Sequence, residues 1–187
     1  MYSDIILIGP QGSGKSTIGE LLSKKLGLPQ VSMDKLRWGY YKEIGYDEEK
    51  AKVLYEKDGF RALYEYWKPF EAHAVERILA EHDNCIIDFG AGHSVYEDDE
   101  LFNRVAKIME PYKNIILLLP SPDLDESVKI LTDLCGEDIS AGIDFNSHMV
   151  KHHSNHDLAK IVIYTKGKTP DQTCEEILKK INEAVSD

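Results

Sequence analysis

The stretch Gly9-Pro10-Gln11-Gly12-Ser13-Gly14-Lys15-Ser16 matches the pattern of a phosphate-binding loop, in which Gly and four free positions precede Gly-Lys and Ser or Thr. Glycines let successive backbone N–H groups point into one hollow, and the loop opens a helix whose free N–H groups and dipole favour phosphate. In such a loop Lys15 reaches the terminal phosphates and Ser16 places its hydroxyl on Mg²⁺. The stretch therefore predicts a nucleotide-dependent enzyme of phosphoryl transfer.

The residues around this stretch provide the context that the loop requires. Residues 4–8 form a short apolar run that ends at Gly9, which is typical of a buried parallel strand. After Ser16, apolar residues recur at helical spacing until Gly27 and Pro29 end the pattern. A Gly/Ser-rich turn that matches by chance has no reason to lie between a strand and a helix. The residues expected to bind ATP are Gly12, Ser13, Gly14, Lys15, Ser16 and Thr17.

The composition of the chain limits its classes of function. The 187 residues suffice for one well-buried core, so we expect a single domain over residues 1–187. Twenty-two basic against 33 acidic residues give a formal net charge of -11, which repels nucleic acid. Cys85, Cys135 and Cys174 have no metal-type spacing, and an odd number without a secretory leader indicates reduced thiols in the cytoplasm. No apolar run reaches membrane-spanning length, so we expect no membrane partner.

Alternating apolar runs and helical patterns predict the fold class. Four further strands are expected after the first, over residues 30–33, 84–88, 114–119 and 161–164. Strands that alternate with helices predict a three-layer α/β/α P-loop NTPase fold with a five-stranded, mostly parallel sheet. A helical substrate lobe, about 34–75, and a lid, about 136–156, are expected outside the sheet.

The predicted substrate lobe is rich in aromatic residues. Residues 37–58 read as helical or irregular, and a long amphipathic helical stretch follows. Its aromatic stripe favours packing in a core over contact with a cofactor. Pro69 is expected to kink or interrupt this helix because it removes one backbone hydrogen bond.

Several polar residues lie where expected strands end and are candidates for the site. Asp34 follows the second strand, where it can hold or deprotonate a substrate hydroxyl, or cap the next helix. Asp88 ends the third strand and is a candidate metal residue together with Ser16. Residues 90–92, Gly-Ala-Gly, allow close approach to a ligand or form a tight turn. Arg61 is either turned toward a substrate anion or exposed on its helix.

These features together resemble the shikimate kinase branch of the nucleoside-monophosphate-kinase-like P-loop family, in order along most of the chain. Residues 59–61, Gly-Phe-Arg, resemble a family segment whose arginine binds the substrate carboxylate, and residues 166–170 resemble the loop beside the adenine base. The resemblance implies ATP and Mg²⁺ as cofactors, a small-molecule hydroxyl as acceptor, and Lys15 and Asp34 as catalytic residues. It further implies that Gly90 and Gly92 lie against the substrate.

The chain departs from this family at several positions. Ser32 stands where the family usually has a further Asp, and Ala91 replaces a glycine. The expected lid contains no arginine and is acidic, with Glu137, Asp138 and Asp144. By alignment Lys151 takes the place of a substrate-binding arginine, and lysine does not replace arginine at a bidentate carboxylate site. The nucleotide site therefore carries over to this chain, whereas shikimate as the acceptor does not.

Three hypotheses of function remain. The leading one is a small-molecule kinase whose acceptor is held by Asp34, Arg37, Arg61, Gly90, Gly92 and Lys151. The second is a nucleoside or nucleotide kinase, in which the aromatic residues of 38–46 stack on a base. The third is a nucleotide-binding regulator with little turnover, which a lid without arginine explains. The acceptor, the preference for ATP or GTP and the oligomeric state stay open.

A group of histidines near the end of the expected lid suggests a second metal site. His148 and His152, or His152 and His156, are four residues apart, so on a helix either pair can hold Zn²⁺. No glutamate completes a His-Glu-x-x-His motif. A lid face that contacts substrate or phosphate, or a plain solvated surface, are the alternatives for these residues.

Overall fold

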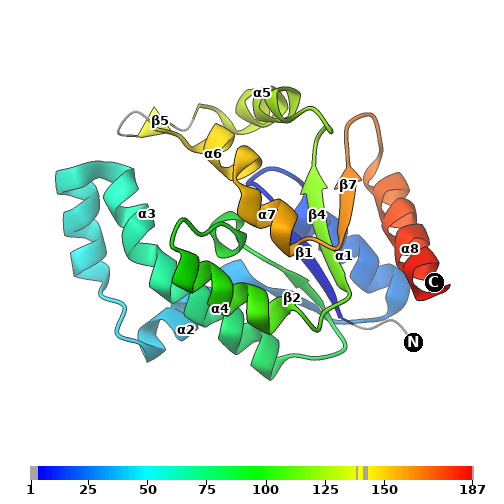
Figure 1. Ribbon diagram of the computed structural model, residues 1–187, viewed down its shortest axis with the longest axis horizontal. Coiled ribbons are helices and arrows are strands. Elements are labelled where there is room, and N and C mark those ends of the chain that lie inside the picture. Colours follow the sequence, from blue (N-terminus) through cyan, green and yellow to red (C-terminus); the bar gives the residue numbers. More distant parts are fainter. Residues whose placement is uncertain (1–3, 138, 141–142, 187) are drawn as a thin grey trace.

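A five-stranded parallel sheet forms the centre of the molecule (Figure 1). The computed structural model describes residues 4–137, 139–140 and 143–186. The strand order is β2-β3-β1-β4-β7, and every pairing in this sheet is parallel. The five expected strands are confirmed as β1 (Ile5–Ile8), β2 (Gln30–Ser32), β3 (Ile86–Asp88), β4 (Asn114–Leu119) and β7 (Ile161–Tyr164).

The central strand β1 is buried on both of its faces. Ile5 and Leu7 belong to one apolar cluster, Ile6 and Ile8 to a second cluster on the opposite face, and all four are 0% exposed. Side chains alternate across a strand, so a strand covered on both sides needs apolar residues at every position. The continuous apolar run in the sequence has this physical cause.

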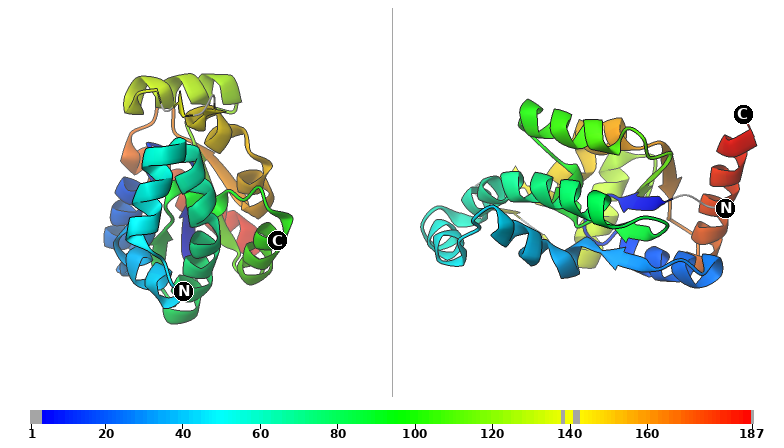
Figure 2. Two further views of the ribbon diagram at one scale, coloured as in Figure 1. Left: turned by 90° about the vertical axis from the view of Figure 1, so that its left-hand side faces the viewer. Right: turned by 90° about the horizontal axis from the view of Figure 1, so that it is seen from below.

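Helices cover both faces of the sheet, which confirms the three-layer architecture. Helices α1 (Lys15–Leu26) and α8 (Pro170–Ser186) pack on one face. The other face is covered by α4 (Asp99–Met109), α7 (His153–Leu158) and the later part of α3 (Glu48–Glu81). Figure 2 (right) shows α1 and α4 on opposite sides of the strands.

Helices α2 (Met33–Glu43) and α3 extend beyond the sheet on the left of Figure 1. Pro69 was expected to kink or interrupt α3; the helix is not interrupted there, and its backbone leaves the helical conformation at Gly59 instead. Gly59 has φ 78° and ψ -172°, a conformation that only glycine adopts readily. Aromatic rings of α2 and α3 pack on one another, for example Tyr41 on Phe70 with centroids 5.7 Å apart. Part of the aromatic stripe thus packs between the helices, while Phe60 and Trp67 line a cavity described below.

The remaining elements lie around the carboxyl edge of the sheet or connect its strands. They are the 3₁₀ helix η1 (Ala91–Ser94), α5 (Leu124–Cys135), the antiparallel pair β5 (Ile139–Ser140) and β6 (Ile143–Asp144), and α6 (Phe145–Lys151). Among the described residues, no helix has the length and apolar character needed to span a membrane.

Strand register brings the predicted site segments together. Asp88 of β3 pairs in register with Leu7 of β1 and with Ser32 of β2, so the segments that follow these three strands begin side by side. Ligands of open α/β sheets bind at this edge, where the strand order changes direction. The loop after β1, the start of α2 and η1 therefore surround one region.

Candidate active site

One cavity of about 620 Å³ joins the glycine-rich loop to the start of α2 and to η1. At one end it is lined by Gly12, Gly14, Lys15, Ser16 and Thr17. At the other end it is lined by Asp34, Arg37, Glu71, Gly90 and Gly92, with an aromatic wall from α3 and α6. The cavity thus joins two groups of residues that are separated in the sequence.

The glycine-rich loop has a backbone that other residues do not readily adopt. Gly14 is the N-cap of α1, with φ 93°. Gly12 has φ 77°, and a Cβ there would lie 2.5 Å from the Cys135 sulfur at the end of α5. Ser13 is buried beneath the loop, where its amide donates to the Pro10 carbonyl at 3.3 Å. The N-terminus of α1 opens into the cavity, as an anion site requires.

Lys15 holds its ammonium group inside this loop. Its Nζ donates to the carbonyl oxygens of Gly9 and Pro10, each at 2.8 Å, and the residue is only 8% exposed. Burial lowers the pKa of Lys15 to about 8, while the carboxylates of Asp34 and Asp88 act in the opposite direction. A phosphate group bound beside Lys15 adds negative charge and would raise this pKa.

Asp88 is the centre of a polar group at the carboxyl end of β3. It is 1% exposed, and its carboxylate accepts hydrogen bonds from Ser16 Oγ at 3.2 Å, Ser32 Oγ at 3.1 Å and Gln30 Nε2 at 2.7 Å. Sequence analysis missed Gln30 in this role. Its signal was the alternation on β2, which places Gln30 and Ser32 on the same side of the strand. Carboxylate and hydroxyl oxygens are donors that suit Mg²⁺.

Asp34 and Arg37 lie together on the first turns of α2, facing the cavity. Asp34 Oδ1 is 3.6 Å from an Arg37 terminal nitrogen. Asp34 does not cap α2, because the N-cap is Ser32, whose hydroxyl bonds to Asp88. The Arg37 guanidinium lies over the Trp38 ring at 4.6 Å, and its buried Nε has no hydrogen-bond partner among the described residues.

A buried ion pair that the sequence analysis missed supports this end of the cavity. Lys68 and Glu71 are 2.6 Å apart and almost fully buried on α3. Lys68 Nζ also donates to the backbone oxygens of Gly92 at 3.1 Å and Val95 at 2.9 Å. The sequence feature that could have revealed this ion pair is two opposite charges, three residues apart, on the apolar face of a predicted helix. The pair fixes η1 against α3.

Glycine at position 92 leaves the space that the Glu71 carboxylate occupies. A Cβ on Gly92 would lie 2.2 Å from Glu71 Oε1, and the ion pair with Lys68 prevents that carboxylate from moving aside. We expect Gly92→Ala to lower the free energy of unfolding by about 1–3 kcal/mol, measured by urea unfolding. Gly39→Ala is the control, because a Cβ at Gly39 on α2 has no neighbour within 4 Å. It should raise stability by about 0.5–1 kcal/mol. Equal effects of both changes would contradict this account.

His93, buried below η1, should make the stability of the protein depend on pH. Burial, with the charges of Arg37 and Lys68, lowers the pKa of His93 to about 3. Between pH about 6.5 and about 3 the unfolded chain therefore binds a proton at this residue and the folded protein does not. As the pH falls, this group should lower the free energy of unfolding by up to roughly 1.4 kcal/mol per pH unit.

The measurement compares urea unfolding of the wild type and His93→Gln between about pH 7 and pH 4. The wild type should lose stability more steeply than the variant as the pH falls. His156→Gln, which changes an exposed histidine, should follow the wild type. Parallel curves for the wild type and His93→Gln would show that His93 titrates alike in both states.

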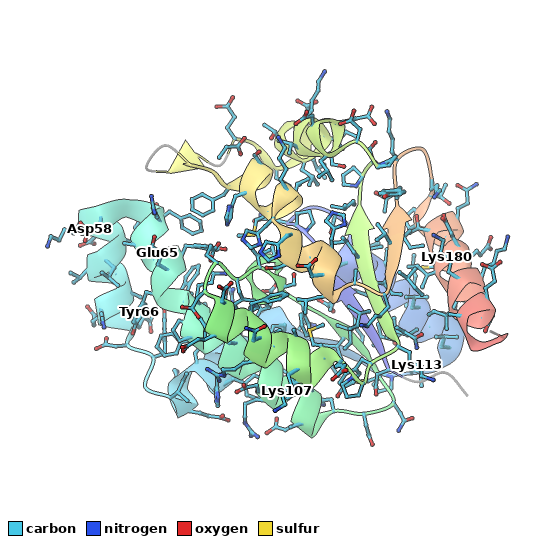
Figure 3. The ribbon with its side chains drawn as sticks, viewed as in Figure 1. Asp58, Glu65, Tyr66, Lys107, Lys113 and Lys180 are labelled. Carbon is cyan, nitrogen blue, oxygen red and sulfur yellow. The ribbon has the colours of Figure 1, made fainter. Side chains whose placement is uncertain are left out.

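Two residues expected to bind substrate do not line the cavity. Arg61 Nε donates to Glu65 Oε1 at 2.9 Å on the outer part of α3, where Figure 3 labels Glu65. Lys151 Nζ pairs with Asp125 at 2.6 Å across to α5. Each side chain pairs with a carboxylate on the surface, so neither faces the cavity in this structure, and their contact with the acceptor stays a prediction. Gly90, in contrast, lies against Asp34, as a Cβ there would be 2.8 Å from Asp34 Oδ1.

The acidic residues expected in the lid have separate positions. Glu137 is exposed, and Asp144 caps α6 by accepting from the Ser147 amide at 3.1 Å. Asp138 and residues 141–142 lie outside the described residues.

A strand that runs into a glycine-rich loop and a helix N-terminus, beside a buried lysine and a serine–aspartate pair, defines a P-loop nucleotide-binding protein. Comparison with known proteins agrees with this class. The sequence model of the AAA domain family matches residues 5–121. Shikimate kinase of Persephonella marina is 32% identical over 184 residues, which cover 95% of this chain and 98% of that protein. Shikimate kinase of Sulfurihydrogenibium sp. is 28% identical over 184 residues, which cover 95% of this chain and 97% of that protein.

Solved structures share the fold. Shikimate kinase from Acinetobacter baumannii in complex with shikimate superposes with a TM-score of 0.66 at 15% identity, covering 98% of this chain and 95% of that chain. Shikimate kinase from Aquifex aeolicus superposes with a TM-score of 0.62 at 20% identity, covering 97% of this chain and 98% of that chain. The chain belongs to the AAA domain family and, through its curated relatives, to the shikimate kinase family. It is a P-loop small-molecule kinase that acts on an alcohol group.

Proposed function

We propose that this kinase transfers the γ-phosphoryl group of ATP to a hydroxyl of a small molecule bound between α2 and η1. The observation that carries the proposal is the single cavity that joins the glycine-rich loop to Asp34 and Arg37. ATP phosphates would lie on the backbone N–H groups of Gly12, Ser13, Gly14, Lys15, Ser16 and Thr17 and on the side chains of those residues that are not glycine.

Ser16 and Asp88 are the residues proposed to hold Mg²⁺. Their hydroxyl and carboxylate already lie 3.2 Å apart, and Gln30 and Ser32 fix the carboxylate from its other sides. The bound ion would neutralise charge on the phosphates during transfer. Lys15 would leave the Gly9 and Pro10 carbonyl oxygens and donate to the terminal phosphate instead.

Asp34 is proposed to orient the acceptor hydroxyl and accept its proton. It lies on a rigid helix turn, beside Gly90 and opposite the phosphate end of the cavity. A carboxylate held there is suited to the role of a general base for an alcohol. Gly90 and Gly92 would let the acceptor lie close to the backbone of η1.

Arg37 is proposed as the main cationic contact of the acceptor. All four arginines of the chain are described, and Arg37 alone lines the cavity. Arg37 lies 3.6 Å from Asp34 inside the cavity, whereas the other three pair with carboxylates that do not line it: Arg61 with Glu65, Arg77 with Glu43 and Glu81, and Arg104 with Glu76. The proposed acceptor is therefore a hydroxylated molecule whose anionic group meets the one guanidinium that lines the cavity. Shikimate is the first acceptor to test, because the Persephonella relative is called shikimate kinase.

A nucleoside or nucleotide acceptor is the second candidate, supported by the aromatic wall of the cavity. Phe60, Tyr64, Trp67, Phe89 and Phe145 line it and would suit a planar ring. The expectation that the aromatic residues of 38–46 stack on a base is not supported, because those rings pack on one another and are absent from the cavity lining.

Residues 34–75 are proposed as a substrate lobe and residues 136–156 as a lid of one kinase domain. Within the described part of the lid, α6 contributes Phe145, Asn146 and Met149 to the cavity. Phe145 packs edge-on against Phe60 of α3 with centroids 4.7 Å apart. The lid and the lobe thus meet over the proposed acceptor.

The test is ADP formation from ATP and Mg²⁺ with a panel of acceptors: shikimate, gluconate and other sugar acids, nucleosides and nucleoside monophosphates. We expect one hydroxylated acid to stimulate ADP release, with phosphate found on its hydroxyl. Stimulation by a nucleoside alone would select the second candidate. Tight nucleotide binding without stimulation by any acceptor would favour a regulator with little turnover and contradict the proposal.

A further inference from the structure

Glu97, His148 and His152 form a cluster of potential metal ligands beside Tyr64, a residue that also lines the cavity. One ligand atom from each lies within 4.8 Å of the ligand atoms of the other two. The three residues come from different segments: Glu97 follows η1, His148 lies on α6, and His152 joins α6 to α7. The sequence offered two histidine pairs without a carboxylate. The fold selects His148 and His152 and supplies the carboxylate from a distant segment.

The candidate ligand atoms lie close together and have further hydrogen-bond partners. His148 Nε2 is 2.6 Å from Glu97 Oε1, and the rings of His148 and His152 have centroids 5.2 Å apart. The Ser154 amide donates to His152 Nδ1 at 3.3 Å. Neutral His152 then carries its ring proton on Nε2, so a metal bound through Nε2 requires that proton to move to Nδ1 and this hydrogen bond to open. Tyr64 donates its hydroxyl to Glu97 Oε1 at 2.8 Å. Such an outer hydrogen bond orients a ligating carboxylate and increases metal affinity.

Buried hydrogen bonds fix the segments that carry these ligands. Ser94 Oγ donates to Asn155 Oδ1 at 2.7 Å, and the Tyr96 amide donates to Ser154 Oγ at 3.3 Å. Ser94, Ser154 and Asn155 are each at most 1% exposed. The chain before Glu97 is therefore held against the chain after His152, so the ligands are brought together by the fold and not by chance contact of flexible side chains.

We propose that Glu97, His148 and His152 bind a Zn²⁺ ion that fastens helix α6 to the segment after η1. Two imidazole nitrogens and one carboxylate oxygen are a donor set that Zn²⁺ accepts, with water as the fourth ligand. The ion would replace the direct contact between His148 and Glu97. Because α6 carries Phe145 and Met149 to the cavity, the ion would also fix that wall of the acceptor site.

Cobalt binding provides the first test, on full-length protein without a histidine tag. Co²⁺ should give the visible absorption of a tetrahedral site with nitrogen and oxygen ligands, and Zn²⁺ should displace it. Cys135, an exposed thiol, would give a strong near-ultraviolet charge-transfer band if it were a ligand, and we expect none. Loss of an outer-shell partner alone costs about 10–100-fold in metal affinity. Glu97→Gln and His152→Ala should therefore each weaken Zn²⁺ binding at least about tenfold.

His156→Ala is the matched control, because His156 is exposed on α7 and belongs to the histidine pair that the fold does not select. It should bind Zn²⁺ like the wild type. Hydrogen exchange gives a second readout: Zn²⁺ should slow exchange of α6 amides in the wild type and in His156→Ala, but not in His152→Ala. No binding by folded wild type, a thiolate band, or equal weakening by His156→Ala would overturn the proposal.

Discussion

Replacing Lys15 with alanine should lower the rate of acceptor-dependent ADP formation by at least about 10²–10³-fold, the usual effect of removing one charge-stabilising donor from a transition state. Lys15 is the cation that lines the phosphate end of the cavity, and its ammonium group is held by the carbonyl oxygens of Gly9 and Pro10. The loss should fall mainly on kcat, because charge on the transferring phosphoryl group is greatest in the transition state. Steady-state kinetics with saturating ATP and Mg²⁺ provides the measurement.

Lys24→Ala is the matched control for this prediction. Lys24 lies on the same helix, exposed and paired with Glu20 at 2.5 Å. Its removal should cost little stability, because an exposed ion pair contributes little. It should also leave kcat and KM close to the wild-type values, because Lys24 does not line the cavity. If Lys15→Ala retained wild-type turnover, the glycine-rich loop would not be the site of phosphoryl transfer.

The change Asp34→Asn should lower kcat by about 10²–10⁴-fold, the range attributed to a general base. Asparagine keeps the shape of the side chain and loses its basicity and its charge opposite Arg37. Binding of ATP should change little, because Asp34 lies at the acceptor end of the cavity. Kinetics at varied acceptor and varied ATP separates these effects.

Asp58→Asn serves as the control for charge removal in the same lobe. Asp58 is exposed near the bend of α3, far from the strands (Figure 3). We expect wild-type kcat for this variant. A wild-type kcat for Asp34→Asn would exclude Asp34 as the base and leave it a positioning role at most.

The nucleotide half of the site was predictable because its parts are neighbours in the sequence. The strand, the loop and the first turn of α1 occupy one continuous stretch, and their patterns are local. Asp88 was predictable as well, since it ends an apolar strand. Gln30 was missed because the alternation on β2 places it on the side of Ser32, but that side faces Asp88 only once β2 pairs with β3.

The acceptor half was predicted less well, because helices present side chains in directions that the sequence does not specify. Arg37 and Arg61 both lie in the expected lobe, yet only Arg37 faces the cavity. The helical conformation of α3 is broken at Gly59, where the backbone takes a positive φ, whereas the helix continues through Pro69. Arg61 follows that break and finds Glu65 one turn later.

The sequence by itself determined the class of fold and the position of the glycine-rich loop between β1 and α1, because apolar periodicity and glycine placement act over a few residues. Tertiary structure alone decided which charged side chains meet. It buried Lys68 with Glu71, paired Lys151 with Asp125, and brought Glu97 to His148 and His152. The contacts of Lys151 and Glu97 join segments that are distant in the sequence, and the burial of Lys68 with Glu71 depends on the packing of η1 on α3. These arrangements are properties of the whole chain.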